Sequence, residues 1–330
     1  MGRALSRQGV VAFGLLHGTV VDAETGEPLA YSIVSLHPGA AEHFTDQAGA
    51  FTFTHVSAGT YRLVVRQIGY VPADTTVVVG PESDLSIRIT LRRVAVELPP
   101  ITVTGALTCV QPGPPDAVVT PALASVFDQL LENARRYRLL VDSFPFSFVL
   151  ERAYTSTGEA RTVDTIGQTS ADERRRYRAG AVIEWGTGPF AGDRIVRLPA
   201  LDQFADSGFV HSHCFRLAGR DTTEGATFIR IDFEPAARIH SPDVAGAAYL
   251  DERSYQLRYT RVSLTRPERG LRGVLGLVAT TRFREIVPGI VLHDHVRAVT
   301  RLPGRMERVE EQRLLAVQFA RPFVQAPKER

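Results

Sequence analysis

The feature that most constrains the fold is a succession of short strand-like runs and turns from Phe13 to Arg92, without a helical period. Apolar and polar residues alternate over Phe51–His55, Tyr61–Arg66, Thr75–Val79 and Leu85–Leu91, as they do in half-buried strands. Glycine-containing breaks between these runs supply the turns. About seven such strands indicate a small β-sandwich.

The segment from Gly18 to Leu36 predicts a β-hairpin. Small and apolar residues alternate with polar ones, and the run is interrupted once, at Asp22–Pro28. That interruption contains a glycine and a proline, which are typical turn residues. We therefore expect two short strands folded back on each other at the start of the sandwich.

A proline-rich stretch separates the sandwich from the clearest helical pattern. Residues 94–119 hold two proline clusters, and this density of proline favours an extended linker. Thr120 is suited to the N-cap and Pro121 to the first turn of an amphipathic helix of about five turns. Its apolar face comprises Leu123, Val126, Phe127, Leu130, Leu131 and Ala134. Arg135, Arg136 and Arg138 are expected in the last turns, where cations oppose the negative end of the helix dipole.

Beyond Ser143 the chain returns to alternating runs joined by turns. Strands are expected at Phe146–Tyr154, Cys214–Leu217, Thr227–Phe233, Ala247–Leu250, Tyr255–Thr260, Gly276–Phe283 and Gly289–Val296, with a last polar strand or short helix at Glu307–Arg313. Gly186–Gly192 has the composition of a loop. Consecutive hairpins beside one helix indicate an α+β domain, with a curved antiparallel sheet around the helix. The predicted fold class is therefore mainly β.

These patterns divide the 330 residues into five parts. Residues 1–12 are expected to be a cropped export signal or a disordered end, because Arg3 and Arg7 precede a short apolar run. The sandwich is assigned to 13–93, the linker to 94–119, the helix-and-sheet domain to 120–320 and a tail to 321–330.

The composition argues against two kinds of partner. Lys and Arg total 38 against 36 Asp and Glu, a net charge of +2, which lacks the basic excess of a nucleic-acid-binding protein. The dense run Glu173–Arg176 is typical of a solvated loop or strand edge. No apolar run reaches the ~20 residues of a membrane-spanning helix. We expect neither a nucleic-acid partner nor a transmembrane helix.

Two His-x-His pairs, His211/His213 and His293/His295, are the candidates for metal chemistry. Residues two apart in a strand share a face, so each pair could direct two imidazoles at one metal ion. A catalytic zinc site needs a third converging ligand, and the sequence has no HExxH motif. Exposed or interfacial histidines on a sheet are the competing interpretation. No metal ligand is assigned.

Other catalytic patterns are missing from the sequence. There is no G-x-S-x-G nucleophile turn and no glycine-rich loop that opens a helix. Asp232 and Glu234 share a strand face by spacing, where carboxylates are typically solvated. Trp185 is the single tryptophan, while Phe53, Tyr61 and Tyr70 are expected in the core or rim of the sandwich. No catalytic or cofactor-binding residue is assigned, and no cofactor is predicted.

The two cysteines, Cys109 and Cys214, leave two possibilities open. In a reducing compartment they would be free thiols, and in an oxidising one they would form a disulfide.

The turn glycines and core residues of the N-terminal part follow a specific order. They are Gly18, Val20, Asp22, Thr25, Gly26, Pro28, Leu29, Val34, Leu36, Thr45, Asp46, Gly49, Phe51, Phe53, Val56, Gly59, Tyr61, Leu63, Gly69 and Tyr70. This order resembles the carboxypeptidase regulatory-like domain, a transthyretin-like (prealbumin-like) β-sandwich attached to many bacterial envelope proteins. In metallocarboxypeptidases the zinc-bearing domain is separate, and its ligand motif is missing here, so the resemblance implies no peptidase activity.

Two further resemblances concern the rest of the chain. Ile101–Gly105 is similar to the segment that leads into the plug of TonB-dependent outer-membrane receptors, from which this chain then departs. The second half looks like an uncharacterised family of bacterial envelope proteins with a cysteine after the connector and another in a His-Cys-Phe segment, here Cys109 and His213–Phe215. That resemblance implies a disulfide between Cys109 and Cys214.

The expected function is that of a non-enzymatic protein of the bacterial envelope, in the periplasm or on the periplasmic face of the outer membrane. The sandwich would bind a glycan or an envelope protein, and the concavity of the second domain could hold an apolar ligand. Two alternatives stay open: an accessory of a TonB-dependent uptake system, and a metal-dependent hydrolase that uses the His-x-His pairs.

Overall fold

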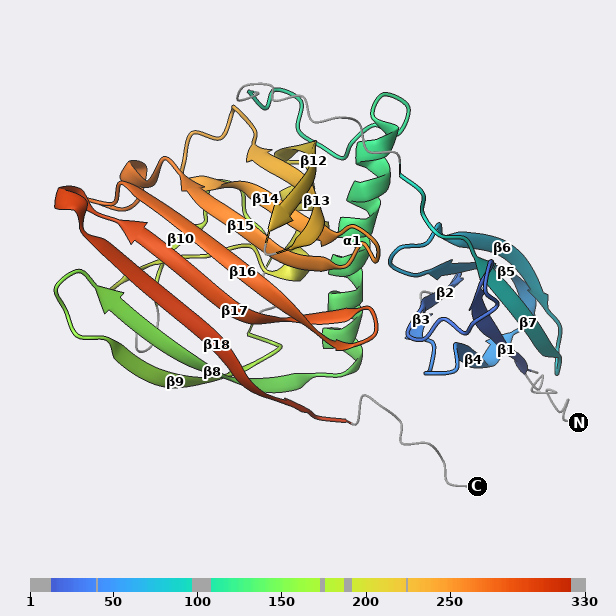
Figure 1. Ribbon diagram of the computed structural model, residues 1–330. Coiled ribbons are helices and arrows are strands. Elements are labelled where there is room, and N and C mark those ends of the chain that lie inside the picture. Colours follow the sequence, from blue (N-terminus) through green and yellow to red (C-terminus); the bar gives the residue numbers. More distant parts are fainter. Residues whose placement is uncertain are drawn as a thin grey trace, which may run out of the picture. The chain divides into compact units, whose positions relative to one another are not determined.

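The computed structural model describes residues 13–39, 41–96, 108–172, 176–186, 192–223 and 225–321. The chain forms two compact units, Met1–Val94 and Ala95–Arg330. Figure 1 shows an all-strand N-terminal unit and a C-terminal unit built on a long sheet and one long helix. The finer division into a leader, linker and tail stays a prediction.

The N-terminal unit is a sandwich of two sheets, and the described residues contribute seven strands to it. The sheet orders are β4-β1-β7 and β3-β2-β5-β6. The strands are β1 (Phe13–Asp22), β2 (Ile33–His37), β3 (Ala41–Phe44), β4 (Ala50–Ser57), β5 (Gly59–Arg66), β6 (Ala73–Val79) and β7 (Asp84–Leu91). β1 and β7 run parallel, and the other paired strands are antiparallel. The predicted seven-stranded sandwich is confirmed.

The predicted hairpin over Gly18–Leu36 is wrong, because β1 and β2 belong to different sheets. The turn after β1 therefore carries the chain across the core. Leu16 and Val20 of β1 enter the same hydrophobic cluster as Val34 and Leu36 of β2. The two strands face each other through their side chains, as strands of opposite sheets do in a sandwich. Alternation alone could not distinguish this crossing from a hairpin.

Two glycines of the N-terminal pattern are required by close backbone approach. A Cβ atom at Gly18 would lie 2.1 Å from the carbonyl oxygen of Ile87, on the parallel strand β7. Gly49 has a φ of +70°, and a Cβ atom there would lie 2.6 Å from the carbonyl oxygen of Val20. Glycine at these positions lets the turns and strands come together without a steric clash.

The C-terminal unit is built on an antiparallel sheet, to which the described residues contribute nine strands in the order β12-β13-β14-β15-β16-β17-β18-β8-β9. These are β8 (Phe146–Ser156), β9 (Thr162–Thr169), β12 (His213–Thr223), β13 (Ala226–Pro235), β14 (Asp243–Asp251), β15 (Leu257–Thr265), β16 (Gly276–Val287), β17 (Ile290–Arg301) and β18 (Glu307–Phe319). Figure 1 shows the sheet curved, with α1 (Pro121–Ser143) running across its strands. The predicted α+β domain is confirmed, and the last segment is a strand.

The segment between β9 and β12 contains short elements that the sequence pattern did not predict. A two-stranded ribbon pairs β10 (Ile183–Trp185) with β11 (Arg194–Val196). The 3₁₀ helix η2 (Leu201–Ala205) and the short helix α2 (Ser207–Val210) follow it. Two further 3₁₀ turns, η3 (Pro267–Arg269) and η4 (Pro303–Arg305), precede β16 and β18.

Helix α1 begins as predicted and continues further than predicted. Thr120 occupies the N-cap position, but its hydroxyl donates to the carbonyl oxygen of Asp116 instead of capping the helix. Of the six predicted face residues, Leu131 is half-buried and the other five are buried. At 23 residues the helix has more than six turns.

Arg135, Arg136 and Arg138 are expected in the last turns of α1, but the final turn of the helix holds no basic residue. Because the helix continues to Ser143, Arg136 lies in its interior and is 1% exposed. The Nε atom of Arg136 donates to the carbonyl oxygen of Gly289 at 2.9 Å, and its Nη1 lies 3.8 Å from the Glu132 carboxylate. Arg136 thus joins α1 to the turn between β16 and β17.

Candidate functional site

A cleft of about 800 Å³ opens in the C-terminal unit beside the second half of α1. Its other walls come from η2, α2 and the segment that follows β9. The floor is made by the buried side chains of Tyr137, Val141 and Tyr177. Arg138 and Asp142, both exposed, are part of its rim. An apolar floor with a charged rim can hold an amphiphilic small molecule.

A second cavity, of about 280 Å³, lies on the inner face of the sheet and shares Tyr137 with the cleft. Leu150 and Phe283 contribute apolar walls. His293 and Gln312 contribute polar groups to the same cavity. Tyr137 therefore lines both the cleft and the inner cavity of the C-terminal unit.

The wall of the cleft is held in place by a buried carboxylate. The hydroxyl of Tyr177 donates to Asp243, which also accepts the backbone N–H of Gly180 at 2.8 Å and of Val244 at 2.7 Å. Burial, and then the Asp243 charge, raise the pKa of Tyr177, so the phenol stays protonated. This arrangement fixes the segment after β9 on β14.

His213 belongs to the same buried network. Its ring stacks on Phe209 at a centroid distance of 4.1 Å, and its Nδ1 and Nε2 lie 2.9 and 3.0 Å from the carbonyl oxygens of Phe209 and Val244. Burial lowers the pKa of His213, while the two carbonyls and Asp243 act in the opposite direction. Both nitrogens face backbone oxygens, so this histidine positions α2 and does not point into the cleft.

The first His-x-His pair does not share a strand face. His211 is exposed at the C-cap of α2, with its Nδ1 3.0 Å from the carbonyl oxygen of Ser207. His213 begins β12 and is fully buried. The chain changes from helix to strand between the two residues, so the predicted two-residue periodicity does not apply.

The second pair is divided by a β-bulge. The register shifts between the pairs Phe283–His293 and Arg282–His295, which leaves one extra residue on β17. His293 lines the inner cavity with Phe283 and lies 5.2 Å from the ring of Phe148. His295 pairs with Arg282, whose side chain points to the opposite face because it is adjacent to Phe283.

A metal centre built on these pairs is not supported by their geometry. Among the described residues, no group of three or more His, Cys, Asp or Glu side chains is placed to hold a metal ion. The two imidazoles of each pair point in different directions, for the reasons given above.

The prediction that Asp232 is solvated is wrong. Asp232 is 8% exposed, and its carboxylate accepts hydrogen bonds from Arg216 and from the Nε atom of Arg230. Two guanidinium groups offset the cost of burying this carboxylate. Asp232 therefore anchors β12 to β13.

Cys109 and Cys214 form a disulfide, with their Cα atoms 5.5 Å apart. The bond connects positions 105 residues apart and joins the segment before α1 to β12. Beside it, Gly113 N–H donates to the carbonyl oxygen of His213, and Ala237 N–H donates to that of Cys109. Residues 108–119 of the predicted linker are thus fastened to the C-terminal unit. Ile101–Gly105 lies outside the described residues.

In the sandwich, a cluster of polar contacts is centred on the Asp22 carboxylate at the end of β1. Tyr70 donates to the Asp22 carboxylate at 2.8 Å, and the Arg93 guanidinium lies 3.1 Å from the same oxygen. The other Asp22 oxygen accepts the backbone N–H groups of Glu24 and Thr25. The Glu24 N–H and the Tyr70 hydroxyl lower the pKa of Asp22 to about 2, and burial, more than the bond to Asp22, raises that of Tyr70 to about 12.

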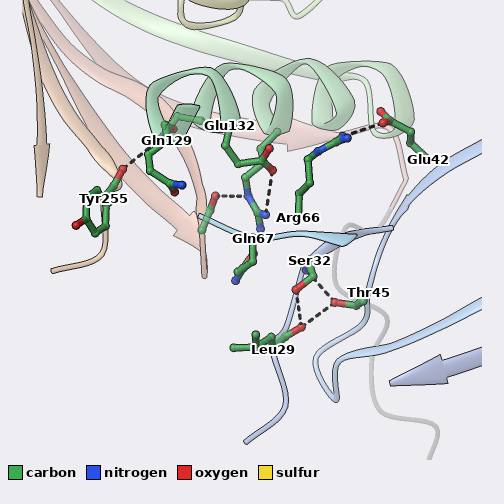
Figure 2. Close-up of polar contacts among 12 residues, drawn as sticks. Leu29, Ser32, Glu42, Thr45, Arg66, Gln67, Gln129, Glu132 and Tyr255 are labelled. Carbon is green, nitrogen blue, oxygen red and sulfur yellow. Dashed lines mark hydrogen bonds and ion pairs between the residues drawn. The ribbon is translucent and has the colours of Figure 1, made fainter. Parts of the chain in front are cut away.

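A second polar cluster holds the crossing between the two sheets of the sandwich. The hydroxyls of Thr45 and Ser32 both donate to the carbonyl oxygen of Leu29, and Ser32 N–H donates to Thr45 (Figure 2). On the neighbouring strands, Arg66 pairs with Glu42 at 2.8 Å (Figure 2). These contacts are structural: they join the segment after β1 to the strands on either side of the crossing.

Residues 16–92 match the model of the carboxypeptidase regulatory-like domain. The N-terminal unit is therefore a carboxypeptidase regulatory-like domain, as its sequence pattern predicted. No curated protein is similar to the chain at a significant level. Among the described helices, none has the length and apolar composition needed to span a bilayer.

Three solved structures are similar to parts of this chain. A candidate carbohydrate-binding protein from Pseudomonas aeruginosa is 17% identical, covers 24% of this chain and 89% of its own, and has a TM-score of 0.21. A LolA superfamily protein from Nitrosomonas europaea is 12% identical, with coverages of 60% and 93% and a TM-score of 0.33. A candidate outer-membrane lipoprotein-sorting domain from Vibrio parahaemolyticus is 9% identical, with 60% and 95% coverage and a TM-score of 0.35. Such distant likenesses assign no function.

Proposed function

We propose that this protein is a non-enzymatic binding protein of an oxidising, extracytoplasmic compartment, and that its ligand site is the cleft beside α1. The observation that carries the proposal is the cleft of about 800 Å³, with its apolar floor and charged rim. Small-molecule sites commonly have volumes of about 300–1,000 Å³. A small amphiphile fits this lining, with its apolar part on Tyr137 and Val141 and its polar part near Arg138.

The titratable groups around the cleft support binding over catalysis. Tyr177, Asp243 and His213 are buried and hydrogen-bonded to one another or to the backbone. A general acid or base must reach a proton on the substrate. These three groups instead hold the walls of the cleft in place, which is the preorganisation that a binding site needs.

The compartment is proposed on the disulfide. Disulfides persist in secreted and periplasmic proteins and are rare in the reducing cytosol. The Cys109–Cys214 bond therefore supports the bacterial envelope, in the periplasm or on the periplasmic face of the outer membrane.

The N-terminal sandwich is proposed as a docking module for a glycan or an envelope protein. Its family membership and its closed hydrophobic core support a stable module that brings no chemistry of its own. A TonB-dependent receptor system is one such partner, and this suggestion depends on the resemblance of Ile101–Gly105 alone.

The cleft is tested with N-phenyl-1-naphthylamine, an apolar amine whose fluorescence rises in apolar sites. We expect saturable binding to the full chain, weakened at least tenfold by Ser207→Trp, because Ser207 is exposed in the lining and an indole there fills the opening. The matched control is Ser147→Trp, at an exposed serine of β8 that does not line the cleft. Undiminished binding to Ser207→Trp, or no binding to the unmodified chain, would refute this site.

A further inference from the structure

Trp185, the only tryptophan of the chain, is 61% exposed at the end of β10. Tryptophan has the largest apolar surface of any side chain and is usually well buried. Its partner across the ribbon is Arg194 of β11. The guanidinium carbon of Arg194 lies 3.8 Å from the centroid of the indole, which is a close cation–π contact. Arg194 therefore covers one face of the indole, and the side chain nevertheless stays 61% exposed.

The ribbon that carries Trp185 is held at both ends. Gly186 N–H donates to the carbonyl oxygen of Asp193 at 2.8 Å, directly beyond the Trp185–Arg194 pair. At the base, Ile183 packs so closely on Gly270 that a Cβ atom there would lie 2.3 Å from its Cδ1. These contacts keep the indole in one orientation, so a ligand that stacks on it need not order a flexible loop.

The opposite face of the ribbon adds a further restraint. The Nε atom of Arg197 lies 3.2 Å from the Glu184 carboxylate, and Arg197 N–H donates to the carbonyl oxygen of Val182. Trp185 and Arg194 are thus a fixed pair on one face, and Glu184 and Arg197 a fixed pair on the other.

We propose that the exposed face of Trp185 is a binding site for a glycan, distinct from the cleft beside α1. A pyranose ring has an apolar C–H face and a rim of hydroxyl groups. The C–H face would stack on the free indole face, while the guanidinium of Arg194 donates hydrogen bonds to the hydroxyls at the edge of the ring. Chains of β-1,4-linked pyranoses fit best, because their equatorial hydroxyls leave the ring faces apolar.

The surroundings of Trp185 favour a sugar over a membrane. The described neighbours in the turn and across the ribbon are Asp193 and Arg194, both exposed and charged. A surface that enters a bilayer presents several adjacent apolar side chains. Among the described residues of the ribbon, Trp185 is the one exposed aromatic ring, and the hydrogen-bonding groups beside it match a ligand that is apolar on its face and polar at its edge.

The uniqueness of Trp185 allows a direct test, because all tryptophan emission of the chain comes from this site. We titrate the full chain with chitohexaose and with cellohexaose. The expected result is a saturable shift of the emission to shorter wavelength with an apparent Kd below about 1 mM. Unchanged emission with both oligosaccharides would overturn the proposal. So would a shift caused by phosphatidylglycerol vesicles but by neither sugar, since that outcome identifies a membrane contact.

Variants separate stacking from unspecific binding, with calorimetry as the readout because Trp185→Ala removes the fluorophore. Trp185→Ala is expected to weaken binding of the responding sugar at least tenfold, and Arg194→Ala by a smaller factor. Leu275→Ala removes an apolar side chain that is 65% exposed elsewhere in the unit and is expected to leave binding unchanged. Undiminished binding to Trp185→Ala, with its thermal unfolding unaltered, would refute the site. The cleft variant Ser207→Trp is expected to bind the sugar normally, so the two sites are tested independently.

Discussion

The two units of this protein stabilise their buried polar groups in different ways. In the sandwich, Asp22 accepts hydrogen bonds from the turn that directly follows it, and Thr45 reaches back to Leu29. In the C-terminal unit, Arg136 of α1 reaches Gly289, and Tyr177 reaches Asp243. The contacts of the sandwich join turns and strand ends to one another, and those of the C-terminal unit attach α1 and the segment after β9 to the sheet.

The difference bears on function. In the sandwich, the core side chains of the two sheets pack against each other. In the C-terminal unit, one long helix and short elements lie against a single curved sheet, and polar contacts attach them to it. Space remains between them, and the cleft and the inner cavity occupy it. This comparison supports the proposal that the C-terminal unit holds the small-molecule site.

Removal of the disulfide should produce the largest difference in stability between the two units. The double variant Cys109→Ser/Cys214→Ser is expected to destabilise the C-terminal unit by about 4–5 kcal/mol, because the bond closes a loop of roughly 100 residues. The sandwich should be unaffected, since both cysteines lie in the other unit. Hydrogen exchange of peptides from each unit measures the two effects separately. Equal loss of protection in both units would show that they do not unfold independently.

Breaking the buried Arg136–Glu132 ion pair of α1 should have the next largest effect on stability. Arg136→Met is expected to cost about 3–5 kcal/mol, because it leaves the buried Glu132 carboxylate without its neighbouring charge. Urea denaturation followed by Trp185 emission reports this unit alone. Arg138→Met, at an exposed position of the same helix, is the control, with an expected change within about 0.5 kcal/mol. A similar cost for both variants would contradict the structural role given to Arg136.

Loss of the Tyr70–Asp22 hydrogen bond of the sandwich should have the smallest effect on stability. Tyr70→Phe removes one hydrogen bond to a carboxylate and is expected to destabilise the sandwich by about 1.5 kcal/mol. The contact also predicts a pH dependence. The pKa of Asp22 is about 2 in the folded unit against an ordinary 3.8, so its contribution is complete above pH 3.8 and is lost as the pH falls towards 2.

Hydrogen exchange of the sandwich peptides between pH 5 and pH 2 measures this dependence, after correction for the intrinsic exchange rate. Tyr70→Phe should weaken the dependence, and Ser32→Ala, in the other polar cluster, should leave its slope unchanged. An identical slope in Tyr70→Phe would show that Asp22 is not stabilised by Tyr70.

The sandwich and most strands could be predicted from the sequence because period-two alternation depends on local burial alone. The same rule failed where a long-range choice decides the outcome. Alternation over Gly18–Leu36 does not say whether β1 and β2 share a sheet, since residues of both strands enter the core either way. The sequence pattern places Arg136 near the end of the helix, because its partner Gly289 lies far along the chain and leaves no local signal.

The candidate sites show the same limit. A helix end separates His211 from His213, and a β-bulge separates His293 from His295. The two-residue spacing of each pair in the sequence reveals neither feature. The sequence shows Trp185 only as a single tryptophan, because its exposure depends on how a short ribbon packs. The cleft is formed by elements distant in the sequence, so no motif could reveal it.

Native mass spectrometry of the protein recovered from an oxidising compartment, without detergent or denaturant, tests the division of roles between the two units most directly. The account predicts a non-covalent small-molecule adduct on the unmodified chain and on Ser147→Trp, and its loss in Ser207→Trp. An adduct that persists in Ser207→Trp, or the bare mass in all three proteins, would contradict the assignment of ligand binding to the cleft beside α1.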